Sequence, residues 1–265
     1  MQPRFGLSFY NQLKPELGEI DASAACLELA MREFISASRQ SSSPTTFIQK
    51  LSGKHGVRVD VFDIGLFVRR GSALRIIGVT QAFEGFLEKF LESHPRIQNR
   101  KGRQDDETLL NFVVRKLGLS SVVAAAFTDA FDYRLYTYYR QLRNGIAHQT
   151  QQPQTSAAVP SLQALQKDTA NDARYIRLSA PNTADHLTFD DYVLFSRAAK
   201  AIAARLCEIS GLSEPEIMEW LEMHRDRSGS IKRQANNVRT LLRVAFGLDP
   251  GSAEKFVINL NLVGQ

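Results

Sequence analysis

Residues 131–148 read FDYRLYTYYRQLRNGIAH, and this stretch gives the clearest indication of the fold. Its apolar and aromatic residues recur at intervals of three and four, which is the spacing of one face of an α-helix. The stretch therefore predicts an amphipathic helix that buries one side and leaves the other polar. The residues on the predicted buried side are Phe131, Leu135, Tyr138, Tyr139, Leu142 and Ile146.

The polar side of this predicted helix ends in a cation and an imidazole. Arg143 offers a planar set of donors that matches phosphate oxygens, and it stays charged at every relevant pH. His148 can take or give a proton near neutral pH. At about 100° per residue the two side chains lie roughly 140° apart around the axis, so they do not converge on one atom. Either Gly145 loosens the last turn, or another helix or another copy of the chain completes the site.

Arg143, the polar Asn144, three further residues and His148 form a pattern that resembles the R-x4-6-H motif of HEPN-domain proteins. Many members of that family are metal-independent ribonucleases of toxin, antiviral and RNA-processing systems. The resemblance implies an all-α helical bundle and a homodimer, in which two copies of the motif face each other in one composite active site. It implies neither a metal nor a cofactor.

Two more predicted helices extend the resemblance over residues 71–210. Residues 73–91 resemble the first helix of the domain, and Glu84 on it is the candidate for an acidic residue near the motif. The alternative for Glu84 is a solvated carboxylate on a surface helix. A later helix is predicted from Phe189 or Asp190 through Ile209. We therefore expect an N-terminal accessory region (1–70), a HEPN-like helical domain (71–210) and a C-terminal helical region (211–265).

The flanking regions are also predicted to be mainly helical. Residues 22–38 and 230–246 have helical patterns, and the second ends at Gly247. Residues 57–64 alternate apolar and polar residues, which predicts a β-strand. A short β-hairpin with residues 65–70 is one interpretation, and a loop that enters a helix is the other. Residues 149–186 are poorly patterned, and we expect an insertion that hangs beside the proposed cleft.

The charge distribution gives candidate RNA contacts, although 33 basic against 28 acidic residues is a modest excess. The first basic cluster lies in the connection after residues 73–91, and its alternative role is a solvated charged surface. On the motif helix, Arg140 is a further candidate, and Tyr139 packs either a base or only the core. A second basic cluster occurs near the C-terminus. The first cluster consists of Arg96, Arg100, Lys101 and Arg103; the second of Arg225, Arg227, Lys232, Arg233, Arg239 and Arg243.

Several classes of protein are disfavoured by what the sequence lacks. No run of 18 apolar residues occurs, and the first six residues lack the apolar segment of a secretion signal. Cys26 and Cys207 are far apart and have no C-x-x-C pattern, so we expect buried thiols in a reducing cytoplasm and no zinc. Phosphate-binding loops, zinc-protease motifs, dinucleotide turns and hydrolase elbows are absent from the sequence. We expect a cytoplasmic protein without a membrane partner.

The motif points to an endoribonuclease that uses the 2′-hydroxyl of RNA as its nucleophile. His148 is the candidate general acid or base, and Arg143 the candidate for holding the phosphate and offsetting its developing charge. Asn144 would orient the phosphate or His148. The expected products are a 2′,3′-cyclic phosphate and a 5′-hydroxyl. We expect a toxin or antiviral-defence effector, controlled by an antitoxin, a regulatory protein or its own flanking regions.

Two alternatives remain open at the level of the sequence. The chain could be a non-catalytic HEPN-like module that binds RNA or a protein partner within a larger defence or toxin-antitoxin assembly. It could also be a helical adaptor in which Arg143 and His148 only stabilise the end of a helix, where cations are favoured.

Overall fold

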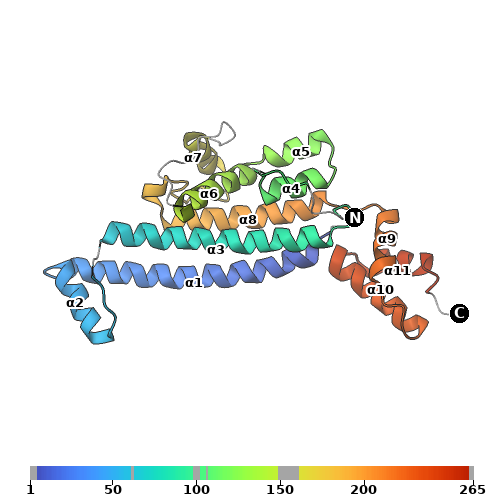
Figure 1. Ribbon diagram of the computed structural model, residues 1–265, viewed down its shortest axis with the longest axis horizontal. Coiled ribbons are helices and arrows are strands. Elements are labelled where there is room, and N and C mark those ends of the chain that lie inside the picture. Colours follow the sequence, from blue (N-terminus) through green and yellow to red (C-terminus); the bar gives the residue numbers. More distant parts are fainter. Residues whose placement is uncertain (1–4, 61–62, 98–101, 106, 149–160, 263–265) are drawn as a thin grey trace. The chain divides into compact units, whose positions relative to one another are not determined.

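The computed structural model describes residues 5–60, 63–97, 102–105, 107–148 and 161–262, and within these ranges it consists of helices and their connections (Figure 1). The all-α prediction is confirmed. In chain order the helices are α1 (Leu7–Gln40), α2 (Pro44–His55), α3 (Ile64–Ser93), α4 (Leu109–Lys116), α5 (Ser121–Thr128), α6 (Phe131–His148), α7 (Leu162–Asn171), the 3₁₀-helix η1 (Ala184–His186), α8 (Phe189–Ile209), α9 (Glu214–His224), α10 (Ile231–Phe246) and α11 (Pro250–Asn259).

Several helix boundaries follow directly from local sequence. α8 has the predicted bounds. α10 ends where expected, because Gly247 adopts a left-handed conformation (φ 64°) that glycine tolerates without steric cost. α9 begins with a capping box, in which Glu216 accepts hydrogen bonds from the backbone and hydroxyl of Ser213 at 2.8 and 2.6 Å.

The predicted β-hairpin is wrong. Its second strand, residues 65–70, lies within α3, which begins at Ile64. Residues 57–60 lie in the connection before this helix, and Val61 and Phe62 are outside the described residues. The alternating pattern therefore has no strand partner beside it, and the interpretation as a loop entering a helix is confirmed.

The chain divides into two compact units, each built from segments that are distant in sequence. The α6 unit comprises residues 16–81 and 131–199, and the α10 unit comprises residues 1–15, 82–130 and 200–265. α1, α3 and α8 each contribute one part to each unit. This division cuts across the linear ranges 1–70, 71–210 and 211–265, which remain a prediction.

In the α6 unit, α1 and α3 run antiparallel side by side (Figure 1). Glu28 of α1 pairs with Arg75 of α3 at 2.8 Å, and further along α1 the Phe34 ring lies 5.7 Å from the ring of Phe67, which comes earlier in α3. α8 joins this pair through Asp21 of α1, whose carboxylate accepts hydrogen bonds from Tyr192 at 2.5 Å and Ser196 at 2.8 Å.

The α10 unit has an aromatic core. The buried ring of Phe5 packs against Phe90 (5.7 Å between ring centroids), Phe246 (5.6 Å) and His94 (4.5 Å). Trp220 of α9 continues the cluster with an edge contact to Phe246 at 5.1 Å. Aromatic pairs in this geometry are attractive beyond the area that they bury. His94 is therefore a core residue of this unit.

Candidate functional site

The motif occupies the last turns of α6, and the helix continues without a break through Gly145 to His148. Gly145 therefore does not loosen the last turn. On a continuous helix Arg143 and His148 lie about 140° apart around the axis, as their spacing implies. The side chain of His148 is outside the part of the molecule that the structure describes.

The predicted apolar face of α6 is the one that is buried. Leu135, Tyr138, Tyr139 and Leu142 are buried, and Phe131 and Ile146 are partly covered at the two ends of the helix. Tyr139 is completely buried, and its ring lies 5.1 Å from that of Phe195 on α8. A base cannot stack on a ring that is enclosed in the core. The expectation that Tyr139 contacts RNA is therefore wrong, and its alternative role in the core is confirmed.

The Tyr139 hydroxyl donates a hydrogen bond of 2.9 Å to the fully buried carboxylate of Asp191, in the first turn of α8. Burial and this neighbouring carboxylate raise the pKa of Tyr139 well above its ordinary value. Asp191 also accepts from the backbone and side-chain amides of Asn182 at 2.8 and 2.9 Å. The backbone and hydroxyl of Thr188 donate to it at 2.9 and 3.1 Å. The N-terminus of α8 also favours this negative charge. Through its hydrogen bonds, Asp191 joins α6, α8 and the segment before α8.

Residues 161–188 form a brace along α6, although their sequence is poorly patterned. Arg134 of α6 pairs with Asp168 of α7 at 2.7 Å. Near the middle of α6, the Tyr138 hydroxyl donates to the carbonyl of Asn182 at 2.7 Å. Burial raises the pKa of Tyr138. Residues 161–186 therefore pack against α6, and the prediction that they form an insertion hanging beside the cleft is wrong. Residues 149–160, the rest of the predicted insertion, lie outside the described residues.

The brace also holds the beginning of α6. Asp132 accepts a hydrogen bond from the Tyr175 hydroxyl at 2.7 Å and forms an ion pair with Arg174 at 3.1 Å. Arg174 is itself bound to Asp172 at 2.7 Å. Hydrogen bonds to charged groups contribute more than neutral ones, so these contacts fix the start of the motif helix as Asp191 fixes its middle.

Arg143 and Asn144 are neighbours near the end of α6, and both are half-buried. The guanidinium of Arg143 donates to the side-chain oxygen of Asn144 at 3.1 Å. Asn144 therefore helps to orient the guanidinium. Arg140, one turn earlier, is also half-buried and has no hydrogen-bond or ion-pair partner among the described residues. This part of the helix can present cationic donors to an anion.

Glu84, the fourth candidate catalytic residue, lies on α3 in the part that belongs to the α10 unit. It is half-buried, and its neighbour Phe83 is buried with its ring 5.9 Å from that of Phe86. Its place near Arg143 and His148 remains a prediction.

The first basic cluster is only partly available as a cation patch. Arg96 forms hydrogen bonds to both oxygens of Glu216 on α9, at 2.6 and 2.8 Å, so its charge is largely compensated. This bidentate pair raises the pKa of Arg96 and lowers that of Glu216 to about 2. Arg96 is therefore not a free cation, and its contact with RNA stays a prediction. Arg103 is exposed and donates to the backbone carbonyl of Glu107 at 3.0 Å. Arg100 and Lys101 lie outside the described residues.

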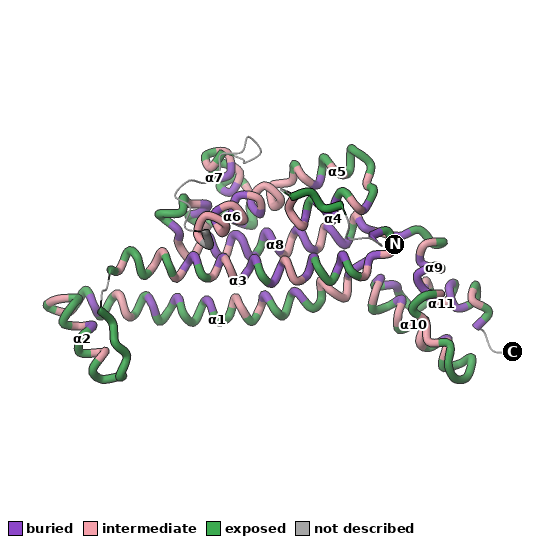
Figure 2. Tube along the Cα trace, viewed as in Figure 1, coloured by how far each residue is buried: buried purple, intermediate pink, exposed green. Residues whose placement is uncertain are grey.

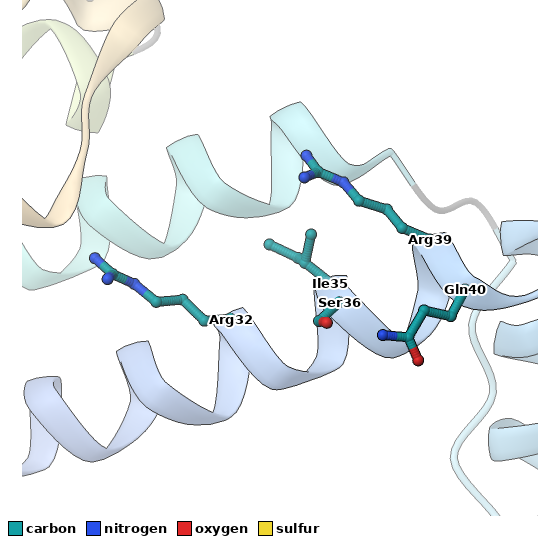
Figure 3. A pocket seen from close by; sticks show the side chains of 5 residues that line it. All are labelled: Arg32, Ile35, Ser36, Arg39 and Gln40. Carbon is teal, nitrogen blue, oxygen red and sulfur yellow. The ribbon is translucent and has the colours of Figure 1, made fainter.

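A shallow hollow lies elsewhere in the α6 unit, on α1. Figure 3 shows its five lining side chains, all from this one helix. Of the two arginines, Arg32 is already paired with Glu28 at 2.9 Å. Ligand sites are normally formed by polar groups that converge from several elements. The hollow lacks that arrangement and is not a candidate for the functional site. Its lining residues are Arg32, Ile35, Ser36, Arg39 and Gln40.

The described residues include neither a metal-binding cluster nor a membrane-spanning helix. Among those residues no group of three or more histidine, cysteine, aspartate or glutamate side chains is placed to hold a metal ion. None of the helices they form is both long and apolar enough to cross a membrane. No protein-family model, no curated protein and no solved structure significantly matches the chain.

Proposed function

We propose that the chain is a metal-independent endoribonuclease, acting as a toxin or antiviral-defence effector. One observation carries this proposal: the helix that ends in the motif is held along its length, and near its end the half-buried Arg143 donates a hydrogen bond to the half-buried Asn144. Catalytic groups are effective only when the surrounding structure fixes their positions. The resemblance of the motif to that of the HEPN ribonucleases supplies the reaction class.

The chemistry needs three things from the protein. A group must remove the proton of the 2′-hydroxyl, a cation must stabilise charge on the phosphate, and the leaving 5′-oxygen must receive a proton. His148 is assigned to proton transfer, which typically accelerates a reaction by about 10²–10⁴-fold. Arg143 holds the phosphate through its planar donors, and Asn144 keeps the guanidinium oriented. The 2′-oxygen bonds to phosphorus as the bond to the 5′-oxygen breaks, which leaves a 2′,3′-cyclic phosphate and a 5′-hydroxyl.

The active site is proposed to be composite. Because α6 is continuous, positions 143 and 148 of one copy lie about 140° apart around its axis, a spacing that does not bring them together on one phosphate. A homodimer resolves this, since the arginine of one copy then acts with the histidine of the other. An antitoxin or another regulatory protein would control the activity by covering this surface or by preventing dimer formation.

The test uses the purified full-length chain and an RNA labelled at both ends. We expect cleavage that continues in excess EDTA, products that carry a free 5′-hydroxyl and a cyclic phosphate, and no cleavage where the nucleotide at the cut has a 2′-deoxy sugar. His148→Ala and Arg143→Ala should each lower the rate at least 100-fold, by removal of acid-base catalysis or of phosphate stabilisation.

His55→Ala is the matched control, because His55 is an exposed histidine at the end of another helix of the α6 unit. It should cleave at the wild-type rate. Loss of activity in EDTA, or full activity in His148→Ala, would contradict the proposed mechanism. Binding of RNA without any cleavage would favour the non-catalytic module instead.

A further inference from the structure

α10 has an unusual charge distribution: it carries four basic residues and no acidic residue. Its apolar side is covered by the rest of the α10 unit, as the buried positions along this helix show (Figure 2). The basic residues are Lys232, Arg233, Arg239 and Arg243, and the buried ones are Ala235, Val238, Leu242 and Phe246. Burial of one side leaves a basic side that faces solvent.

Ion pairs occupy half of the second basic cluster. Glu222 pairs with both Arg225 and Arg227, each at 2.7 Å. Glu254 of α11 accepts two hydrogen bonds from Arg239, at 2.8 and 2.9 Å. The charges of these three arginines are therefore compensated by carboxylates within the fold, and only the other three cations of the cluster could bind an external anion.

The other three cations are available. Lys232 and Arg243 are exposed and have no hydrogen-bond or ion-pair partner among the described residues. Arg233 reaches Asp226 only at 3.8 Å, and its side chain is 70% exposed. Asn236 and Thr240 are exposed between them. We call these five residues the α10 face. They fall within about 100° of the helix circumference, and Lys232 and Arg243 lie about 16 Å apart along the axis.

The first turn of α10 places positive charge where a helix disfavours it. The N-terminus of a helix carries a partial positive charge, so acidic residues there are stabilising and basic ones are not. α9 follows this rule, with Glu214 and Glu216 in its first turn. α10 has Lys232 and Arg233 in its first turn and no acid. These two side chains and the positive end of the helix dipole therefore raise the positive potential at this end of α10.

We infer that the α10 face binds the phosphate backbone of RNA. Cations along one helix face match a strand of phosphates, and Asn236 and Thr240 supply hydrogen-bonding groups of the kind that contact phosphate and sugar oxygens. The choice of RNA rests on the proposed function. An anionic membrane fits less well, because the exposed apolar residues Ile231 and Val244 stand at opposite ends of α10 and form no continuous apolar surface.

Binding is measured by fluorescence anisotropy with a labelled single-stranded RNA, over a series of salt concentrations. The full-length His148→Ala protein is used so that cleavage does not interfere. In this background the triple variant Lys232→Ala, Arg233→Ala and Arg243→Ala should weaken binding at least about tenfold at low salt. The slope of log K against log salt should fall in magnitude by about 2, because each lost phosphate contact removes about 0.7.

The control removes three exposed lysines elsewhere, Lys50 and Lys54 on α2 and Lys167 on α7, and so lowers the net charge equally. It should bind RNA as the His148→Ala protein does. A second variant, Lys232→Arg with Arg243→Lys, keeps the charges and should keep the salt slope. A triple variant whose slope equals that of the control would overturn the inference, as would a duplex DNA that competes as well as RNA.

The outcomes separate this inference from the proposed function. If wild-type protein cleaves RNA but the α10 triple variant leaves binding unchanged, only the inference about α10 fails. If binding depends on the α10 face but wild-type protein never cleaves, the endoribonuclease proposal fails and the binding site stands.

Discussion

The hydroxyl of Tyr139 lies 2.9 Å from the carboxylate of Asp191, and both residues are completely buried. Through this contact a helix that ends in the candidate site is joined to the first turn of α8. The same carboxylate accepts hydrogen bonds from Asn182 and Thr188, so it also holds the end of the brace. The middle of the motif helix is therefore held by one buried charge.

Asp191→Asn should be much more destabilising than Tyr139→Phe. Tyr139→Phe removes one donor and leaves Asp191 with its other partners, so we expect a loss of about 1–2 kcal/mol. In Asp191→Asn an amide NH2 replaces an accepting oxygen and faces N–H and O–H donors, so we expect a loss of about 3 kcal/mol or more. Urea denaturation of both variants measures the difference.

Asp185→Asn is the control for this comparison. Asp185 is also in the α6 unit, but its carboxylate is 79% exposed and its ion pair with Arg69 is on the surface. We expect a change within about 0.5 kcal/mol. Equal losses for Asp185→Asn and Asp191→Asn would show that the buried carboxylate does not hold the brace.

The stability of the α10 unit should decrease below neutral pH because of His94. Its ring accepts a hydrogen bond from the Arg96 backbone N–H at 3.3 Å and donates one to the Ser210 carbonyl at 3.3 Å, which requires the neutral ring. Burial lowers the pKa of His94 to about 4, against 6.5 for an unperturbed histidine. The unfolded chain therefore binds a proton first as the pH falls. The stabilisation is complete above pH 6.5 and is lost progressively between pH 6.5 and 4, by up to about 3 kcal/mol.

His94→Gln tests the origin of this dependence. A glutamine stays neutral and keeps an N–H donor for the Ser210 carbonyl, so the variant should be less stable at pH 7.5 but should lose less stability between pH 6.5 and 4. Urea midpoints at pH 7.5, 6 and 5 give the comparison. Parallel curves for wild type and variant would assign the pH dependence to other groups.

The helices could be predicted from the sequence because their signals are local. Periodic apolar residues indicate α6 and α8, and a glycine that can adopt positive φ marks the end of α10. The hairpin prediction failed because it also used a local signal, the alternation of residues 57–64. A strand needs a partner strand, and the nearby candidate, residues 65–70, belongs to α3.

The contacts that organise the site are not local and leave little trace in the sequence. The sequence around Asp191 is typical of a helix N-terminus, but nothing near it indicates Tyr139, 52 positions away, as a partner. Arg96 belongs to a run of basic residues, whereas Glu216, its partner, is 120 positions away. The contacts between the brace and α6 also escaped prediction, because they are hydrogen bonds and an ion pair between distant residues and leave no apolar periodicity.

Arg96→Ala should affect stability and not RNA binding. Its guanidinium binds both oxygens of Glu216 and the Gly211 carbonyl, and its side chain is 32% exposed, so we expect a loss of about 1 kcal/mol. Because the pair lowers the pKa of Glu216 to about 2, this contribution is present above pH 4.5 and disappears as the pH falls towards 2.

A double-mutant cycle with Glu216→Gln isolates the pair, and RNA affinity is measured on the same proteins. We expect a coupling energy of about 1 kcal/mol at pH 7, a much smaller one at pH 2.5, and unchanged affinity. A drop in affinity as large as that of the α10 triple variant would show that Arg96 contacts phosphate.

Mixing two inactive variants should restore cleavage if the active site is composite. In a dimer of Arg143→Ala with His148→Ala, the composite site keeps one of its two cross-copy pairs, made of the arginine of one copy and the histidine of the other, and the second pair lacks both groups. Random mixing makes half of the dimers mixed, with one intact pair of two, so activity should return to about a quarter of the wild-type rate. Each variant alone, treated identically, should remain inactive, and native mass spectrometry confirms the mixed dimers. If mixed dimers form without activity, the active site is not composite and both groups come from the same copy. The last turn of α6 must then move, because positions 143 and 148 lie about 140° apart around the helix axis.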